Sequence, residues 1–398
     1  MSAGRPSILY VASHWPLGRE SYGAQQRTLQ IGRALKRYGD VRLVIGRVDA
    51  SCRASRRATE REFDVARVDE FASTPVRGPR ARLRHAFDSR EMNTGGHAAA
   101  EAARHKLHTL VDDADVTWVH TIRLANAYRR WRWPRSVLDV DDFTSQYFVT
   151  EADDAARFRG RLLARYRASM WTRRESRLPE RFDRLVVCSE RDRARSPDPD
   201  RTVAIPNGFA DVPTIPPLDP GAPYVGVIGK MSYEPNRNGV QWFLDHIWRE
   251  VLTRHPRARF RIVGADCDPS WAAAPNVDVL GYVDDTEQEM AAWALTVVPV
   301  HVGAGTRVKI AEAFARGVPV LSTTLGAFGY EVTSGRELLL ADTPDVFAAD
   351  CVRLIDSAEL RQQLRDAGRR YFAGRLSTDA QAERVRETLA PMLEARSR

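Results

Sequence analysis

Cysteine is scarce in this sequence, and the few that occur lie far apart. The chain has four cysteines, and no two of them form a CxxC pair. This pattern argues against a disulfide framework and against a zinc site, and it favours a reducing compartment. We therefore expect a cytoplasmic protein that holds no metal.

Long hydrophobic runs are also missing. No apolar stretch approaches the roughly 18 residues that a membrane helix requires. The N-terminal residues lead into a short apolar strand and do not read as a signal peptide. A chain of 398 residues that is 43% apolar and 28% charged is therefore expected to be soluble, globular and divided into two domains.

Lysine is also scarce. The chain has only Lys36, Lys106, Lys230 and Lys309, so almost all of its basic residues are arginines. Residues 1–210 hold 39 lysines and arginines against 27 acidic residues, whereas the remainder holds 21 against 25. A basic first half favours an anionic partner, such as phospholipid, a phosphate-linked acceptor or nucleic acid. Solvated arginine-rich helices explain the same excess equally well.

Short apolar runs alternate with longer helical stretches along most of the chain. This alternation is typical of parallel sheets that helices cover on both faces. It predicts an α/β fold with two doubly wound, Rossmann-like domains. A helix is expected at 24–39, and buried strands at 7–13, 41–46, 116–120, 136–140, 184–190, 224–229, 259–266, 277–283, 295–300 and 318–323.

The alternation breaks at residues 195–224, a span that holds eight prolines. Such a span is typical of a linker or a domain edge. We predict one domain over residues 1–210 and a second over 211–375. Ligands of open parallel sheets bind beyond the carboxyl ends of the strands, so the loops that follow the strands are the candidate sites.

One such loop, Gly-Ala-Gly-Thr-Arg at 303–307, follows a strand and precedes a helix. Glycines let backbone N–H groups approach a phosphate, and a helix N-terminus adds partial positive charge. The spacing fits neither the dinucleotide fingerprint nor a Walker loop. The alternative is a tight connection followed by a surface ion-pair row of Lys309, Glu312 and Arg316.

The order of residues in GTRVKIAEAFARGVPVLSTTLGAFGYE (305–331) resembles the nucleotide-sugar site of glycosyltransferase family 4, whose members have the GT-B fold of two Rossmann-like domains facing a cleft. The resemblance implies that Glu312 binds the donor ribose, since a carboxylate can accept hydrogen bonds from both the 2′- and 3′-hydroxyls. Ala304 stands where many members carry a second glutamate, and the GAGTRxK form resembles a subgroup of bacterial sugar transferases. The family motif EA-x-A-x-G-x-PV is present as Glu312, Ala313, Ala315, Gly317, Pro319 and Val320.

The resemblance also implies the rest of the donor site. Lys230, Arg307 and Lys309 would meet the diphosphate, with Lys230 preferred to Arg237 in the loop that follows residue 228. Tyr282 and Val283 would flank the nucleobase. The donor would be a nucleoside-diphosphate sugar, with UDP or GDP expected, and no cofactor would be needed. The backbone contacts would come from Gly229, Gly303, Ala304, Gly305 and Thr306.

In the first half the resemblance is thinner. Gly23 would let the backbone approach the diphosphate, and His120 at a strand end would hydrogen-bond the donor sugar. Arg27 would serve an acid group of the acceptor, unless it is an exposed helix charge, and Asp141 and Asp142 would lie near the acceptor. The C-terminal helix at about 376–398 would pack back on the first domain.

Three other patterns are weaker. The aspartates at 139–142 resemble a metal-binding DxD motif of a different transferase fold, which lacks two tandem sheets. His105 and His108 have helical spacing but no third ligand. The Arg-Trp run at 129–134 is more typical of a domain edge than of a surface for lipid or nucleic acid.

We thus expect a metal-independent glycosyltransferase that acts on a glycan, lipid-linked or small-molecule acceptor. The family resemblance implies that the transfer is retaining and that the leaving phosphate itself takes the acceptor proton. The basic first domain also favours peripheral contact with the inner face of the membrane. The alternatives are a non-catalytic GT-B scaffold that binds a nucleotide sugar, and nucleic-acid binding, which we do not expect.

Overall fold

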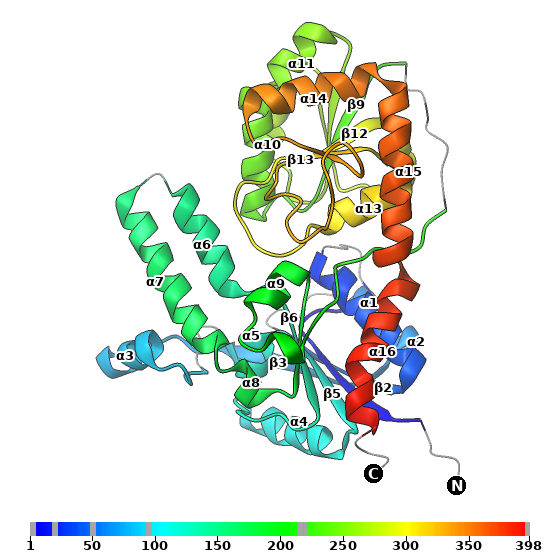
Figure 1. The fold of residues 1–398 in the computed structure, drawn as a ribbon. Helices are drawn as coiled ribbons and strands as arrows, with labels where there is room; N and C mark the ends of the chain where they lie inside the picture. The colour runs from blue at the N-terminus through cyan, green and yellow to red at the C-terminus, as the bar shows by residue number, and fades with distance from the viewer. Residues whose placement is uncertain are drawn as a thin grey trace. The chain divides into compact units, whose positions relative to one another are not determined.

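The computed structural model describes residues 5–17, 23–47, 53–92, 97–155, 157–213, 218 and 221–394. The chain forms two compact units (Figure 1). Unit 1 comprises Met1–Pro206 and Gln381–Arg398, and unit 2 comprises Asn207–Ala380. Each unit is built on its own mainly parallel sheet, so the predicted α/β class is confirmed.

Unit 1 contains an eight-stranded sheet of order β4-β3-β2-β1-β5-β6-β7-β8, parallel except for the antiparallel β3–β4 pair. Its strands are β1 (Ser7–Ala12), β2 (Asp40–Arg47), β3 (Asp64–Ser73), β4 (His97–Ala99), β5 (Val116–His120), β6 (Ser136–Asp141), β7 (Arg184–Val187) and β8 (Thr202–Ala204). The helices are α1 (Gly23–Tyr38), α2 (Arg53–Glu62), α3 (Pro79–Phe87), α4 (Glu101–Asp113), α5 (Ile122–Ala127), α6 (Thr144–Asp154), α7 (Phe158–Glu175), α8 (Leu178–Arg181), α9 (Glu190–Arg195) and the 3₁₀ turn η1 (Pro199–Arg201).

The C-terminal helix α16 (Thr378–Glu394) contributes to the core of unit 1. Its buried residues Ala382, Val385 and Leu389 belong to one cluster with Ile8 and Val116 of the central strands. Gln381 Nε2 also donates to the carbonyl oxygen of Pro206 at 2.8 Å. The helix therefore packs on the sheet of the unit that begins the chain.

Helices α6 and α7 form a pair that extends away from the sheet of unit 1 (Figure 1). The carboxylate of Glu175, at the end of α7, accepts hydrogen bonds from the backbone N–H and the hydroxyl of Ser145, at the start of α6. Free N–H groups at a helix start favour a carboxylate there. Glu175 thus holds the end of α7 against the start of α6. The opposite end of the pair lies away from the sheet of unit 1 (Figure 1).

Unit 2 contains a six-stranded, fully parallel sheet of order β11-β10-β9-β12-β13-β14. Its strands are β9 (Tyr224–Ile228), β10 (Arg259–Val263), β11 (Val277–Gly281), β12 (Trp293–Val298), β13 (Val320–Ser322) and β14 (Leu339–Leu340). The helices are α10 (Glu234–His246), α11 (Trp248–Arg254), the 3₁₀ turn η2 (Pro269–Ala273), α12 (Thr286–Ala291), α13 (Val308–Arg316), α14 (Pro344–Asp356) and α15 (Ala358–Arg375).

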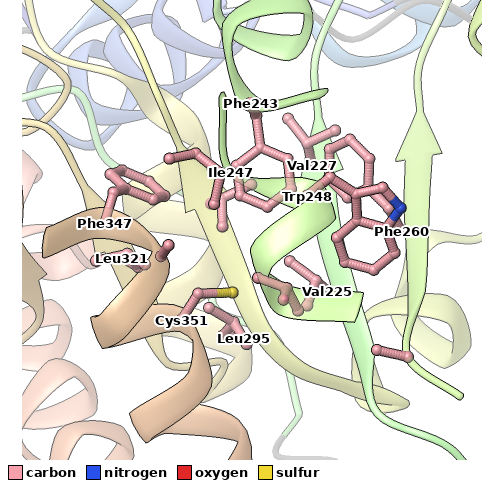
Figure 2. Close-up of a cluster of buried hydrophobic side chains, with 14 of the residues drawn as sticks. Val225, Val227, Phe243, Ile247, Trp248, Phe260, Leu295, Leu321, Phe347 and Cys351 are labelled. Carbon is pink, nitrogen blue, oxygen red and sulfur yellow. The ribbon is translucent and has the colours of Figure 1, made fainter. Parts of the chain in front are cut away.

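One face of this sheet is covered by an aromatic-rich core (Figure 2). Phe243, Trp248 and Phe260 pack with ring centroids 4.6–6.1 Å apart, and Phe347 of α14 closes on Phe243. The indole N–H of Trp248 donates to the carbonyl oxygen of Pro275 at 2.8 Å, so this buried polar group is paired. This packing fixes α10 and the strands whose carboxyl ends form the site described next.

Candidate functional site

The strand order of unit 2 creates a crevice between two neighbouring strands. From β9 the chain proceeds outward to β10 and β11, and then returns to place β12 on the other side of β9. Ligands of doubly wound sheets bind at such a switch point, beyond the carboxyl ends of the strands. The loops that follow β9 and β12 therefore define the candidate site.

The loop after β9 makes a close backbone turn. Gly229 has φ 156°, and a Cβ atom there would lie 2.7 Å from Asn236 Nδ2 and 3.1 Å from Lys309 Nζ. The backbone of Gly264 approaches Gly229 so closely that a Cβ on Gly264 would be 1.8 Å from the Gly229 oxygen. Gly229 thus leaves room for side chains of both loops around it.

Asn236, on the first turn of α10, joins the two loops. Its Nδ2 donates to the carbonyl oxygen of Lys230 at 2.9 Å, and its Oδ1 accepts from Lys309 Nζ at 2.9 Å. Lys230 itself is partly exposed, with Nζ 3.7 Å from Asp266 Oδ2. Asn236 therefore connects the backbone of Lys230 to the side chain of Lys309, and these are two of the four lysines of the chain.

The pKa of the Lys309 ammonium lies well below its usual value. Burial lowers its pKa to about 7, and the nearby positive charge of Arg307 acts in the same direction, whereas Glu312 opposes them. A partly buried ammonium without a carboxylate in direct contact is destabilised until an anion binds. The site is thus suited to an anionic ligand near Lys309.

Arg307 supports the glycine-rich loop from inside. Its Nη1 donates to the carbonyl oxygens of Ala304 and Gly305, and its own carbonyl accepts from Tyr330 Oη at 2.9 Å. Gly303 has φ 128°, and a Cβ there would lie 2.7 Å from Arg307 Nη2. The loop geometry therefore depends on this glycine and this arginine together.

Three buried polar atoms around this loop have no protein partner among the described residues. They are Thr306 Oγ1 and the Nε and Nη2 atoms of Arg307. Buried donors in native proteins are normally paired with protein, water or ligand. Such donors, beside glycines and at the start of α13, provide a place for phosphate oxygens.

Glu312 lies one turn after Lys309 on α13. Its Oε1 accepts from Thr286 Oγ1 at 3.2 Å and from Arg316 Nε at 3.1 Å. Among the described residues no hydrogen bond to Oε2 is found, so that oxygen can still accept. Of the ion-pair row that we considered as an alternative, only the Glu312–Arg316 pair forms, because Lys309 turns to Asn236.

The remaining donor-side residues lie where β11 ends. Tyr282 is about half exposed, and Val283 is partly buried against the cluster that contains Ile310 and Phe314 of α13. Val283 is thus packed against the same helix that carries Lys309 and Glu312, and Tyr282 is its chain neighbour.

A second group of polar residues lies at the switch point of unit 1, between β1 and β5. His120, at the end of β5, is fully buried, with Nδ1 3.4 Å from Ser13 Oγ and Nε2 3.9 Å from Asp141 Oδ2. Burial and the neighbouring His120 lower the pKa of His14 to about 4. Burial opposes ionisation of Asp141, but His120 and Arg27 outweigh it and hold the pKa of Asp141 below its usual range.

Arg27 differs from one of its two predicted environments. It is 2% exposed, so the expectation of an exposed helix charge is wrong. Its guanidinium donates to both carboxylate oxygens of Asp139 at 2.7–3.0 Å and to the carbonyl oxygen of Ile205 at 2.9 Å. A side chain held in this way stabilises the strand ends of unit 1, and its role toward an acceptor acid stays a prediction. Gly23 begins α1, and Asp142 is partly buried beside Asp141.

Sequence reasoning missed Asn236, Thr286 and Tyr330. Asn236 lies within the loop that the resemblance selected, but an uncharged amide on a helix gives no signal of its own. Thr286 begins α12 and Tyr330 follows β13, 26 and 23 residues from their partners Glu312 and Arg307, and only the fold brings these pairs together.

Comparison with known proteins agrees with this geometry. Residues 222–357 match the family model described as glycosyl transferases group 1. No curated protein matches the chain.

Solved structures match over nearly its whole length. Sucrose-phosphate synthase from Thermosynechococcus elongatus has 16% identity and a TM-score of 0.70, covering 98% of this chain and 100% of that one.

Two further structures give the same result. HepE of Anabaena, solved with UDP and glucose, has 15% identity and a TM-score of 0.64 over 97% of this chain and 100% of its own. WaaG, described as a glycosyltransferase of lipopolysaccharide biosynthesis, has 14% identity and a TM-score of 0.63 over 96% of this chain and 99% of its own. The fold is that of a GT-B glycosyltransferase. The match to the model of the group 1 glycosyl transferases spans residues 222–357, all of which lie within unit 2.

The structure also bears on membrane association. In the part of the chain that it describes, no helix is both long enough and apolar enough to cross a bilayer.

Proposed function

We propose that unit 2 binds a nucleoside-diphosphate sugar, with UDP as the first candidate nucleotide, and that the protein transfers the sugar to an acceptor hydroxyl. The observation that carries this proposal is the pair of hydrogen bonds from Asn236 to the Lys230 carbonyl oxygen and to Lys309 Nζ, which join the loops after β9 and β12 at the switch point. Thr306 Oγ1 and the Nε and Nη2 atoms of Arg307, for which the described residues offer no partner, lie within the same loop. UDP is preferred to GDP because the Anabaena HepE structures are complexes with UDP and UDP-glucose.

The proposed placement follows the charges. The diphosphate would lie against the 303–306 backbone and the two lysines. Oε2 of Glu312 would accept from a ribose hydroxyl, and Tyr282 and Val283 would border the base. His120 of unit 1 would hydrogen-bond a hydroxyl of the transferred sugar.

The proposed reaction is a retaining transfer that requires no metal. The bond between the anomeric carbon and the β-phosphate oxygen breaks while the acceptor hydroxyl oxygen bonds to the same face of that carbon. The acceptor proton passes to the departing phosphate oxygen, so the step needs no carboxylate base. Negative charge grows on the diphosphate during the step, and fixed cations and dipoles stabilise that charge most when they are already in place.

The test is a calorimetric titration of the full chain with UDP, GDP, ADP and dTDP, each with and without EDTA. We expect one nucleotide to bind in EDTA, and Glu312→Ala to weaken it by about 10- to 100-fold, the worth of a charged hydrogen bond. Inorganic pyrophosphate should bind Glu312→Ala and wild type alike. Binding that requires a divalent metal, or that is unaffected by Glu312→Ala, would contradict the proposal. Product stereochemistry by NMR then tests retention.

A further inference from the structure

The exposed apolar side chains of unit 1 are concentrated in three helices. In the described part of this unit, every large hydrophobic residue that is classed as exposed lies on α3, α6 or α7. Phe158 is 76% exposed, and Phe87 is 64% exposed. The set consists of Leu83, Phe87, Val149, Phe158, Leu162, Leu163 and Tyr166. Single exposed hydrophobic residues are ordinary, but such a cluster marks an interaction surface.

Three of the four exposed hydrophobic residues of helix α7 lie on one side of it. Phe158, Leu162 and Tyr166 are spaced four residues apart and so lie on one stripe, whereas Ala164, Ala168 and Trp171 are buried on the opposite side. Residues 157–163 are all exposed. The stripe is thus a free helix face at the end of the pair that extends from unit 1 (Figure 1).

Helix α3 repeats the same chemistry beside the base of α7. It has no buried residue and carries Leu83 and Phe87 outward. Its end is fastened to α7 by Arg173 and Arg174, which donate to the carbonyl oxygens of Ala86 and His85. A helix without a buried face gains nothing from the core of its own domain, so its apolar side chains are available to a partner.

Positive charge predominates around these side chains, although Arg84 pairs with Glu91 at 3.1 Å and α6 also holds Glu151, Asp153 and Asp154. Residues 79–87 and 157–167 hold eight arginines and no aspartate or glutamate. Arginines flanking Phe and Leu are typical of helices that lie in the interface of a membrane with anionic lipids. A second copy of the same surface would be repelled by like charge. Nucleic acid would match the arginines but would leave Leu162 and Leu163 without apolar contacts.

We propose that the exposed face of α7, with α3 beside its base, docks the protein on an anionic lipid bilayer. The arginines would contact lipid phosphates, and Phe158, Leu162 and Leu163 would enter the acyl boundary. We call the exposed face of α7 together with α3 the α3–α7 surface. The proposal does not depend on nucleotide binding by unit 2.

The test is co-sedimentation of the full chain with vesicles of phosphatidylcholine alone, or of phosphatidylcholine mixed with phosphatidylglycerol. Wild type should bind the mixed vesicles and lose most of that binding in high salt, because the contact is electrostatic and exposed. The variant Arg159→Ser/Arg161→Ser/Arg165→Ser should bind about 100-fold more weakly, at about fivefold per arginine. Phe158→Ser/Leu162→Ser should lose at least about tenfold through the lost apolar insertion.

Matched controls come from unit 2. Arg249→Ser/Arg254→Ser/Arg257→Ser removes three exposed arginines, and Val346→Ser removes an exposed apolar residue, so both should bind vesicles like wild type. All variants should keep their circular dichroism and their nucleotide affinity. Four outcomes would overturn the proposal. The protein could bind neutral vesicles as well as mixed ones, or both α7 variants could bind mixed vesicles as tightly as wild type. The α7 substitutions could instead dissociate a dimer without changing vesicle binding, or the protein could bind single-stranded RNA and no vesicles.

Discussion

Lys309 Nζ donates to Asn236 Oδ1 at 2.9 Å, across the two loops that follow β9 and β12. The same amide holds the carbonyl oxygen of Lys230 through Nδ2. One uncharged side chain therefore orients two cation-bearing segments without neutralising either cation. A carboxylate in its place would form a salt bridge with Lys309 and repel a diphosphate.

Asn236→Ala should weaken UDP and pyrophosphate by a similar factor of about 10, because both ligands depend on the orientation of Lys309 and of the Gly229–Lys230 turn. Isothermal titration measures both affinities. Asn238→Ala, an exposed asparagine of the same helix, is the matched control and should bind like wild type. Equal affinities in the two variants would remove Asn236 from the site.

Lys309→Met should stabilise the unliganded protein while it weakens diphosphate binding. The pKa of Lys309 falls from 10.5 to about 7 on folding, so the unfolded chain binds more protons between those values. The destabilising effect of the buried ammonium is complete below about pH 7 and disappears as the pH rises to 10.5. The difference in melting temperature between variant and wild type should therefore be largest near pH 7 and shrink at higher pH.

The same pKa makes wild-type nucleotide affinity depend on pH. Above about pH 7 the unliganded site loses its ammonium charge, so the affinity for UDP should fall as pH rises and binding should take up protons. Lys309→Met should lack this dependence. Titrations in buffers of different ionisation enthalpy measure the proton uptake, and an affinity that does not change between pH 6 and 9 would contradict this role.

The Arg27–Asp139 pair should carry stability rather than acceptor binding. Arg27→Met leaves the buried Asp139 carboxylate without its main partner, and breaking such a pair costs about 3–5 kcal/mol. Arg33→Met is the matched control, because its pair with Glu62 is exposed and should cost about 0–1 kcal/mol. Thermal scans compare the melting temperatures of Arg27→Met and Arg33→Met with that of wild type. Arg27→Met/Asp139→Leu should recover part of the loss, and a stable but inactive Arg27→Met would instead favour an acceptor role.

The sequence predicted the central strands well because they are buried on both faces and read as continuous apolar runs. Strand β3 was missed because its sequence DVARVDEFAS is largely polar and exposed. Strand β4 was missed because it has only three residues and pairs antiparallel at the sheet edge. Strands of this kind depend on their neighbours, and local composition does not reveal them.

Within the site, the glycines and Glu312 were predicted because an ordered motif carries them. The partners of Arg27 and Lys309 could not be predicted in the same way. Asp139 lies 112 residues from Arg27, and Asn236 lies 73 residues from Lys309. No periodicity links such positions, since the sheet order alone decides which strand ends meet. Burial, which turned Arg27 from a surface charge into a buried partner of Asp139, is likewise a property of the fold.

Gly303→Ala should disrupt the diphosphate loop more than it disrupts the fold. The new Cβ would lie 2.7 Å from Arg307 Nη2 at a backbone φ of 128°, so Arg307 must move and release the carbonyl oxygens of Ala304 and Gly305. Gly335→Ala is the matched control, since Gly335 also has a positive φ, 86°, but nothing lies within 4 Å of its added Cβ. Both should lose about 1–3 kcal/mol of stability through backbone strain. Only Gly303→Ala should also lower UDP affinity, by at least about tenfold. If titration shows the same affinity in both variants, the position of Arg307 does not matter to the nucleotide, and the loop is only a connection between β12 and α13.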